Sequence, residues 1–218
     1  SVAYTRRQFE LFMEGREQVL RAGFDLPICH VCNTAATLNW PEMHLQMVRP
    51  GCATEGVYPT QAVKRSVELR PAFSLKSHVA RLKVLPPGSA VSYGRTYVTS
   101  KPTKIALVPV GFGDGYRRDF SNRGYALVRG QRANVVGRVC MDQHMLDVSH
   151  IPDVELHDEV VLIGKQGNDE ITVDELGALL GTSPFEFVVC TTPRIPRVYI
   201  RGGEIVSVKD LFSHWVDE

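Results

Sequence analysis

The chain has 218 residues and a formal charge of +1, and its length allows one ordinary domain or two small ones. Its 44% hydrophobic and 22% charged residues are typical of a globular protein that buries a core. The near-zero charge argues against binding to nucleic acid or membranes, because both depend on clustered basic residues. No apolar run approaches the roughly 20 residues of a membrane span, and residues 1–6 do not resemble a secretory signal. We therefore expect a cytoplasmic protein.

The first part of the chain is predicted to alternate helices with short buried strands. Thr5 begins a capping-box pattern at the start of a helix that Gly23 would end. Apolar runs at 26–31 and 43–48 predict two strands, with a short helix over 35–38 between them. Two such βα units are too few to close a parallel sheet, since a (β/α)8 barrel needs roughly 250 residues.

From residue 75 onward the chain consists of short segments rich in Val and Ile, divided by turn residues. This pattern predicts an antiparallel β domain of about eight strands. The expected strands cover 77–84, 103–110, 125–128, 133–139, 145–148, 159–163, 198–200 and 205–208. One helix is expected after Thr172, which forms a capping box with Glu175, and Gly181 would end it. We therefore divide the chain into domains 1–74 and 75–218.

Three glycines, Gly111, Gly113 and Gly115, follow one of the predicted strands. A nucleotide-binding loop would need a helix directly after them, because the phosphate lies on the free N–H groups of that helix. The polar segment that follows has no helical period, so we predict a strand that ends in a glycine loop. Tyr93, considered alone, is typical of a surface or interface position.

Metal and redox sites find little support in the sequence. Five scattered cysteines do not form a disulfide framework, and the pair Cys29 and Cys32 lacks a second pair of soft ligands. We interpret these thiols as buried and free. Cys140, Asp142 and His144 alternate along one face of a possible strand, so a metal site is conceivable there. A fourth ligand is lacking, and a strand end that leads into a turn is the favoured interpretation.

Six short segments form a pattern that none of them carries alone. They are His30-Val-Cys-Asn-Thr-Ala-Ala36, Met47-Val-Arg-Pro-Gly51, Val91-Ser-Tyr-Gly-Arg-Thr96, Val108-Pro-Val-Gly-Phe-Gly-Asp-Gly-Tyr116, Gly137-Arg-Val-Cys-Met-Asp-Gln143 and Pro193-Arg-Ile-Pro-Arg-Val-Tyr199. In order and spacing they resemble the alanine racemase family, whose members are two-domain cytosolic enzymes that depend on pyridoxal 5'-phosphate (PLP).

The resemblance implies a fold that is α/β plus mainly β. Residues 1–74 correspond to the last part of a (β/α)8 PLP-binding barrel, and residues 75–218 to a C-terminal β-barrel-like domain. The implied activity of the full-length protein is the interconversion of L-alanine and D-alanine by two-base proton transfer, for peptidoglycan precursor synthesis. The Schiff-base lysine of the family has no counterpart in this chain, so we expect the isolated chain to be inactive.

The resemblance also assigns cofactor-binding roles. Arg49 matches the arginine that faces the pyridine nitrogen of PLP, and a guanidinium, as a permanent donor, would keep that nitrogen unprotonated. The other implied cofactor-binding residues are His30, Asn33, Thr34, Gly51 and Cys52. No metal is expected.

Two further residues receive roles in catalysis by the same resemblance. Tyr93 matches the catalytic tyrosine that serves one face of the substrate, and Met141 matches the residue whose backbone N–H meets the substrate carboxylate. In the family both act from the neighbouring subunit, which implies a homodimer with a shared active site. The implied substrate is a small amino acid.

Two departures from the family pattern leave the substrate open. Phe112 and Pro193 stand where the family usually has tyrosines. A serine racemase or a racemase of broad specificity is therefore an alternative. A second alternative is a noncatalytic module for dimerisation or ligand binding.

Overall fold

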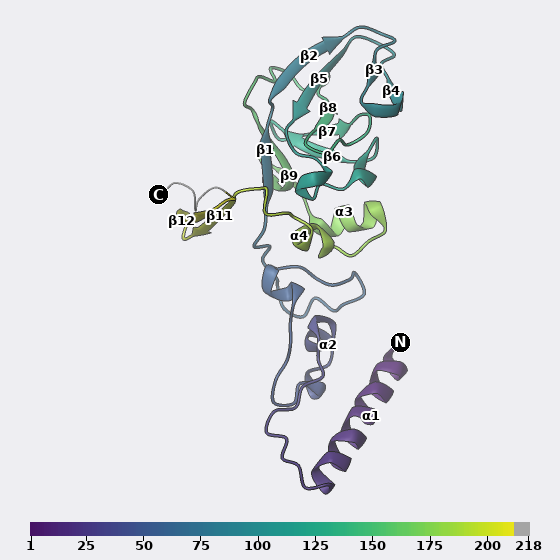
Figure 1. The fold of residues 1–218 in the computed structure, drawn as a ribbon, viewed down its shortest axis with the longest axis vertical. Coiled ribbons are helices and arrows are strands. Elements are labelled where there is room, and N and C mark those ends of the chain that lie inside the picture. The colour runs from purple at the N-terminus through teal and green to yellow at the C-terminus, as the bar shows by residue number, and fades with distance from the viewer. Residues whose placement is uncertain (212–218) are drawn as a thin grey trace. The chain divides into compact units, whose positions relative to one another are not determined.

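The computed structural model describes residues 1–211 and divides into two compact units, Ser1–Ala72 and a C-terminal unit that starts at Phe73 (Figure 1). The sequence-based boundary lies between residues 74 and 75. Within the described residues, no helix combines the length and the hydrophobicity that a membrane span requires.

The N-terminal unit begins with helix α1 (Val2–Arg21). Gly23, at φ +87°, ends the helix as predicted, and its N–H donates to the Leu20 carbonyl. The predicted start was wrong, because the helix begins one turn before Thr5. The Thr5 hydroxyl lies inside the helix and donates to the Ser1 carbonyl at 3.3 Å. No residue of α1 is buried.

The rest of this unit contains short helical turns joined by irregular chain. They are α2 (Thr34–Asn39) and the 3₁₀ turns η1 (Pro41–Met43) and η2 (Cys52–Glu55). The strands predicted at 26–31 and 43–48 do not form. A single parallel bridge joins Asn33 to Arg49. Parallel strands are stable only inside a sheet with neighbours on both sides, and the described residues of this unit supply no such neighbours.

The C-terminal unit is built on an antiparallel sheet, as the sequence predicted. The sheet has eight strands, and the strands predicted at 198–200 and 205–208 form outside it. Its strands follow the order β1-β9-β6-β7-β8-β5-β2, with β10 paired to β9. Their bounds are β1 Leu75–His78, β2 Arg81–Leu85, β5 Thr103–Val108, β6 Tyr125–Val128, β7 Gln131–Val135, β8 His144–Asp147, β9 Glu159–Gln166 and β10 Asp169–Ile171. Two separate ribbons pair β3 (Ala90–Val91) with β4 (Tyr97–Val98), and β11 (Arg197–Arg201) with β12 (Glu204–Lys209).

The stretch predicted as one strand over 77–84 is two strands, at opposite ends of the sheet order. β1 pairs with β9 and β2 pairs with β5, although only Val79 and Ala80 separate them. The Val79 N–H donates to Asp158 at 2.9 Å and the Ala80 N–H donates to Leu107 at 2.9 Å. Consecutive residues therefore bond beside the strands that neighbour β1 and β2, so the sheet curls and its two edge strands are joined at this dipeptide.

The core of the C-terminal unit lies inside this curled sheet. Leu127, Leu146 and Leu162 have no exposed surface. Helix α3 (Val173–Leu180) begins as predicted, with the Thr172 hydroxyl accepting the Glu175 N–H at 3.1 Å, and Gly181 at φ +71° follows it. A second short helix, α4 (Glu186–Val189), was not predicted. It contributes the buried ring of Phe187, which packs on Phe120.

Candidate functional site

Tyr93 lies in a tight 3₁₀ turn, η3 (Tyr93–Arg95), between the short strands β3 and β4. Its side chain is 71% exposed. Ser92 and Arg95 adopt φ values of +65° and +51°, a region that non-glycine residues rarely enter, and Gly94 is at +72°. Such backbone strain is typical of functional sites, where it fixes the direction of one side chain. The turn therefore presents the Tyr93 phenol to the outside of the unit.

The turn is fastened to the segment that precedes Met141. The Ser92 hydroxyl donates to the Arg138 carbonyl at 2.6 Å and lies 3.4 Å from the Cys140 sulfur. A Cβ on Gly137 would come within 2.6 Å of the Val91 carbonyl oxygen, so only glycine allows this approach. The structure thus brings Tyr93 and the Met141 segment together within the C-terminal unit.

Met141 lies in a loop held by the glycine segment that follows β5. The Phe112 N–H donates to the Cys140 carbonyl at 3.0 Å, and the Gly113 N–H donates to the Met141 carbonyl at 2.8 Å. A Cβ on Gly111 would come within 2.2 Å of the Cys140 oxygen. The glycine loop was predicted correctly, and its function is to let two backbones touch. Met141 itself is 55% exposed, and its N–H has no hydrogen-bond partner among residues 1–211.

The three residues considered for a metal site have three different partners. Cys140 contacts Ser92, and Asp142 accepts a hydrogen bond from Arg194. His144, at the start of β8, is fully buried and bonds to the Val110 carbonyl at 2.7 Å. In the described part of the chain, no group of three potential metal ligands converges.

The residues predicted to bind the cofactor all lie in the N-terminal unit. The Arg49 N–H donates to the Cys32 carbonyl at 2.9 Å, next to the bridge between Arg49 and Asn33. The Asn33 side chain accepts the Ala36 N–H at 3.1 Å, and Thr34 is buried. The two predicted cofactor-binding stretches, 30–34 and 49–52, therefore run side by side at this bridge.

Room for an anion is visible at two points of these stretches. A Cβ built on Gly51 would contact nothing, so open space adjoins this backbone. His30 has a buried Nδ1 atom without a hydrogen-bond partner among the described residues. Amide, hydroxyl and backbone N–H donors suit a phosphate dianion, so Asn33, Thr34 and the backbone at Gly51 fit the phosphate end of PLP.

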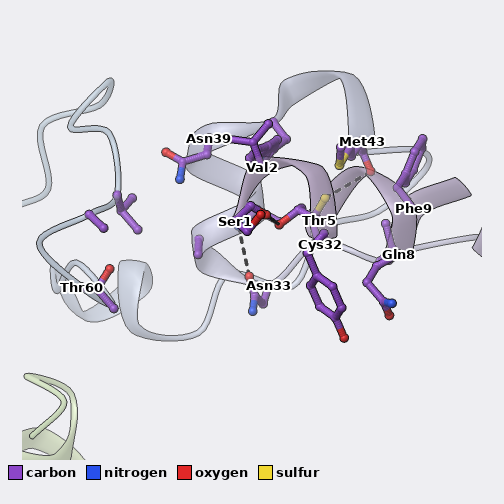
Figure 2. Close-up of a pocket in the computed structure, with 17 residues that line it drawn as sticks. Ser1, Val2, Thr5, Gln8, Phe9, Cys32, Asn33, Asn39, Met43 and Thr60 are labelled. Atoms are coloured by element: carbon purple, nitrogen blue, oxygen red, sulfur yellow. Dashed lines mark hydrogen bonds between the residues drawn. The ribbon is translucent and has the colours of Figure 1, made fainter.

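A hollow of about 500 Å³ lies elsewhere in the N-terminal unit, between α1 and the segment around α2 (Figure 2). Asn33 contributes to its wall, together with Phe9 and Met43. Arg49 and Gly51 are not among the residues that line it. Of the six predicted cofactor-binding residues, Asn33 alone lines this hollow, so it is not the predicted cofactor site.

Sequence reasoning assigned no role to an ionic group behind the Met141 loop. Arg194 contacts two carboxylates there, Asp114 in the glycine loop and Asp142 beside Met141. These three residues lie far apart in the sequence, and only their membership in family-like segments singled them out. The tyrosine replacements lie in the same region, since Phe112 is 44% exposed on the glycine loop and Pro193 precedes Arg194.

Comparisons with known proteins give one consistent result. Residues 72–199 match the family described as alanine racemase, C-terminal domain, and residues 1–59 match alanine racemase, N-terminal domain. The alanine racemase of Clostridium tetani is 42% identical over 95% of this chain and 54% of its own length. That of Desulfosudis oleivorans is 46% identical over 92% of this chain and 52% of its own length.

Solved structures agree. The alanine racemase from Bacillus anthracis with bound L-Ala-P has a TM-score of 0.92 and 34% identity, over 98% of this chain and 55% of that one. The alanine racemase of Clostridium difficile 630 in complex with cycloserine has a TM-score of 0.89 and 36% identity, over 96% and 55%. The chain spans about half the length of the curated relatives that it matches.

Proposed function

The chain belongs to the alanine racemase family, a PLP-dependent family, and we propose that it is the C-terminal part of a cytoplasmic enzyme that interconverts L-alanine and D-alanine. In this proposal residues 1–74 are the last part of a (β/α)8 barrel, and the product D-alanine serves peptidoglycan precursor synthesis. The observation that carries the proposal is the exposed phenol of Tyr93, held beside the loop of Met141.

Racemisation needs one base on each face of the substrate Cα, because a proton must leave one face and another must arrive on the other. The Tyr93 hydroxyl is exposed, and its backbone is fixed by the strained turn and by the Ser92 hydrogen bond. We assign it the proton transfer on one face. Bound PLP would supply the electron sink that stabilises the charge at Cα. A lysine outside this chain would serve the other face.

We assign the binding of the substrate carboxylate to the backbone N–H of Met141. This N–H lacks a partner among residues 1–211, and the Cys140 carbonyl of the same peptide plane is held by the Phe112 N–H at 3.0 Å, so the N–H has a fixed direction. A neutral backbone donor can hold a carboxylate without moving a proton. Arg49, Asn33, Thr34, Gly51, Cys52 and His30 would hold the cofactor.

Removal of the Tyr93 hydroxyl tests the catalytic role. In the full-length protein, Tyr93→Phe is expected to lower the racemisation rate by a factor of about 10² to 10⁴, the usual contribution of a general acid or base. Exchange of the Cα hydrogen with deuterated water should persist for one enantiomer of alanine, because the second base remains. Tyr199→Phe removes the same group from another exposed ring and serves as the control. Full racemisation by Tyr93→Phe would refute the assignment.

We further propose that the active enzyme is a homodimer in which Tyr93 and Met141 of one copy serve the cofactor held by the N-terminal unit of the other. Inactive Tyr93→Phe and Arg49→Ala copies, mixed and allowed to exchange subunits, should regain about a quarter of the wild-type activity, since half of the dimers then hold one intact site. Mixtures that stay inactive despite proven exchange would place both residues in the same copy's site.

The isolated chain should be inactive, because the Schiff-base lysine of the family has no counterpart in it. A coupled assay for D-alanine with added PLP measures this directly. Turnover that Tyr93→Phe abolishes would show that the 218 residues are sufficient.

The exposed Phe112 gives one specific reason to consider a different substrate. It lacks the hydroxyl of the usual tyrosine on the loop that touches Met141. Serine or broad-range racemisation is therefore the second candidate, and kinetics on L-alanine and L-serine with the full-length protein separate the two. If neither amino acid is racemised, a noncatalytic dimerisation or binding module is the explanation.

A further inference from the structure

Arg194 lies between two carboxylates that belong to different loops. Its Nη2 donates to Asp142 Oδ1 at 2.5 Å, and its Nε lies 3.5 Å from Asp114 Oδ1. The Asp114 side chain is 11% exposed, whereas those of Arg194 and Asp142 are 41% and 63% exposed. One planar guanidinium therefore links a nearly buried anion to a solvent-facing one.

The two carboxylates fix the two loops that meet at Met141. Asp114 accepts the Gly111 N–H at 2.8 Å and so closes the turn η4 (Phe112–Asp114) of the glycine loop. Asp142 is the residue directly after Met141. Arg194 thus links the glycine loop, whose Gly113 N–H holds the Met141 carbonyl, to the loop that contains Met141.

The loop around Met141 is held by four contacts. The Cys140 N–H donates to the Gln143 carbonyl at 2.9 Å, the Phe112 N–H donates to the Cys140 carbonyl at 3.0 Å, and the Gly113 N–H donates to the Met141 carbonyl. The fourth contact is the ion pair between Asp142 and Arg194. After these contacts the Met141 N–H is left without a protein partner among residues 1–211.

Gly113 provides the space in which the guanidinium lies. A Cβ at this position would come within 2.1 Å of Arg194 Nη1, and within 3.1 Å of the Met141 carbonyl oxygen. Because residue 113 has no side chain, the Arg194 guanidinium and the Met141 carbonyl can both lie close to its backbone.

We propose that Arg194 is a positioning residue for substrate carboxylate binding, which it controls by setting the direction of the Met141 N–H. This inference rests on the proposed function, in which that N–H receives the carboxylate. The ion pair with the exposed Asp142 adds little to folding stability, so its contribution lies in the geometry of the loop. Lysine cannot replace it fully, because one ammonium does not reproduce a planar fork between two carboxylates.

The test uses the full-length protein with Arg194→Gln, Arg194→Lys and Gly113→Ala. Arg194→Gln is expected to raise KM for alanine by about tenfold or more, as expected for a misdirected hydrogen bond to a charged group, with a smaller change in kcat. The dissociation constant of propionate, which carries only the carboxylate, should rise by the same factor. Arg194→Lys should lie between wild type and Arg194→Gln.

Gly113→Ala tests the position of the Arg194 guanidinium separately from its charge. It keeps the guanidinium and both carboxylates but displaces Arg194, so it should weaken propionate binding as Arg194→Gln does. Arg123→Gln, which removes an exposed guanidinium bonded to the Leu179 carbonyl, is the control and should leave KM unchanged. If Arg194→Gln does not fold, as judged by thermal unfolding, Arg194→Lys and Gly113→Ala test the positioning role in its place.

The results distinguish two failures. A wild-type protein that neither racemises alanine nor binds propionate would overturn the proposed function, and this inference with it. An active wild type whose Arg194→Gln variant keeps KM and propionate affinity within about twofold would overturn the positioning role alone.

Discussion

The imidazole of His144 is fully buried and stacks on Tyr116, with ring centroids 4.6 Å apart. A carbonyl only accepts hydrogen bonds, so the contact with Val110 places the proton of the neutral ring on Nδ1. Nε2 is buried without a partner among the described residues. Burial lowers the pKa of His144 from 6.5 to about 4, while the hydrogen bond to Val110 opposes that shift.

This pKa makes folding stability depend on pH. The unfolded chain binds a proton at His144 below about pH 6.5, whereas the folded protein resists protonation down to about pH 4, so stability is full above 6.5 and falls as the pH drops toward 4. Between about pH 7.5 and about pH 5 the expected loss from this residue is about 2 kcal/mol. Urea unfolding at both pH values measures it.

His144→Gln is the matched control, since an amide can donate to Val110 and does not titrate. The variant should lose less stability than the wild type over the same pH interval. Equal losses in both proteins would mean that another group causes the acid sensitivity.

At the scale of single residues, the sequence predicted the glycine loop but not the residues that this loop contacts. Gly111 and Gly115 were recognisable as turn residues, yet their close contacts are the backbones of Cys140 and Cys190. Periodicity carries no information about such distant contacts. The ionic contacts of Arg194 escaped prediction for the same reason, while Tyr93 and Met141 were found through family resemblance.

Among the secondary-structure elements, two similar capping-box patterns, at Thr5 and at Thr172, had different outcomes. Thr172 follows strand β10 closely, so the chain enters α3 from an extended conformation and the hydroxyl caps it. Thr5 follows residues that can themselves be helical, and α1 simply extends past it to Ser1. The pattern predicts a helix start only where the preceding residues cannot themselves join the helix.

The cap of α3 can be measured. Thr172→Ala should lower the free energy of unfolding by about 1 kcal/mol, because the Glu175 N–H loses its acceptor. Thr172→Ser keeps the hydroxyl and should restore most of the loss. Urea unfolding provides the comparison, and an alanine variant as stable as the serine variant would show that the cap contributes nothing.

The two predicted strands that did not form show that a local sequence pattern alone is not sufficient to predict a strand. The apolar runs at 26–31 and 43–48 have strand-like composition, but in the described structure they meet only at the bridge between Asn33 and Arg49. By contrast, the Val-rich and Ile-rich segments after residue 100 find partners within the C-terminal unit and become strands. Pairing partners, rather than propensity, decided the outcome.

Over the whole molecule, burial is distributed unequally. Ala126, Leu127 and Val128 on β6 are fully buried, whereas α1 has no buried residue and Phe9 lines an open hollow. An isolated amphipathic helix is marginal in water, since most helix stability in proteins comes from packing.

Hydrogen exchange of the 218-residue chain should therefore reveal two levels of stability. Amides of β6 are expected to exchange at least ~10³-fold more slowly than those of α1, because exchange from β6 requires opening of the core. Mass spectrometry of peptides from each element measures both rates. Equal protection of α1 and β6 would show that the helix is stabilised as strongly as the core.

The dipeptide Val79–Ala80 has a consequence for solubility. It joins the two edge strands β1 and β2, each of which has a single strand neighbour, and so keeps their free margins close together at this point. A few flexible residues inserted between Val79 and Ala80 would let the margins part. Each margin would then be more open to strand addition by another molecule, and the chain would acquire a route to fibrils that the short connection restricts.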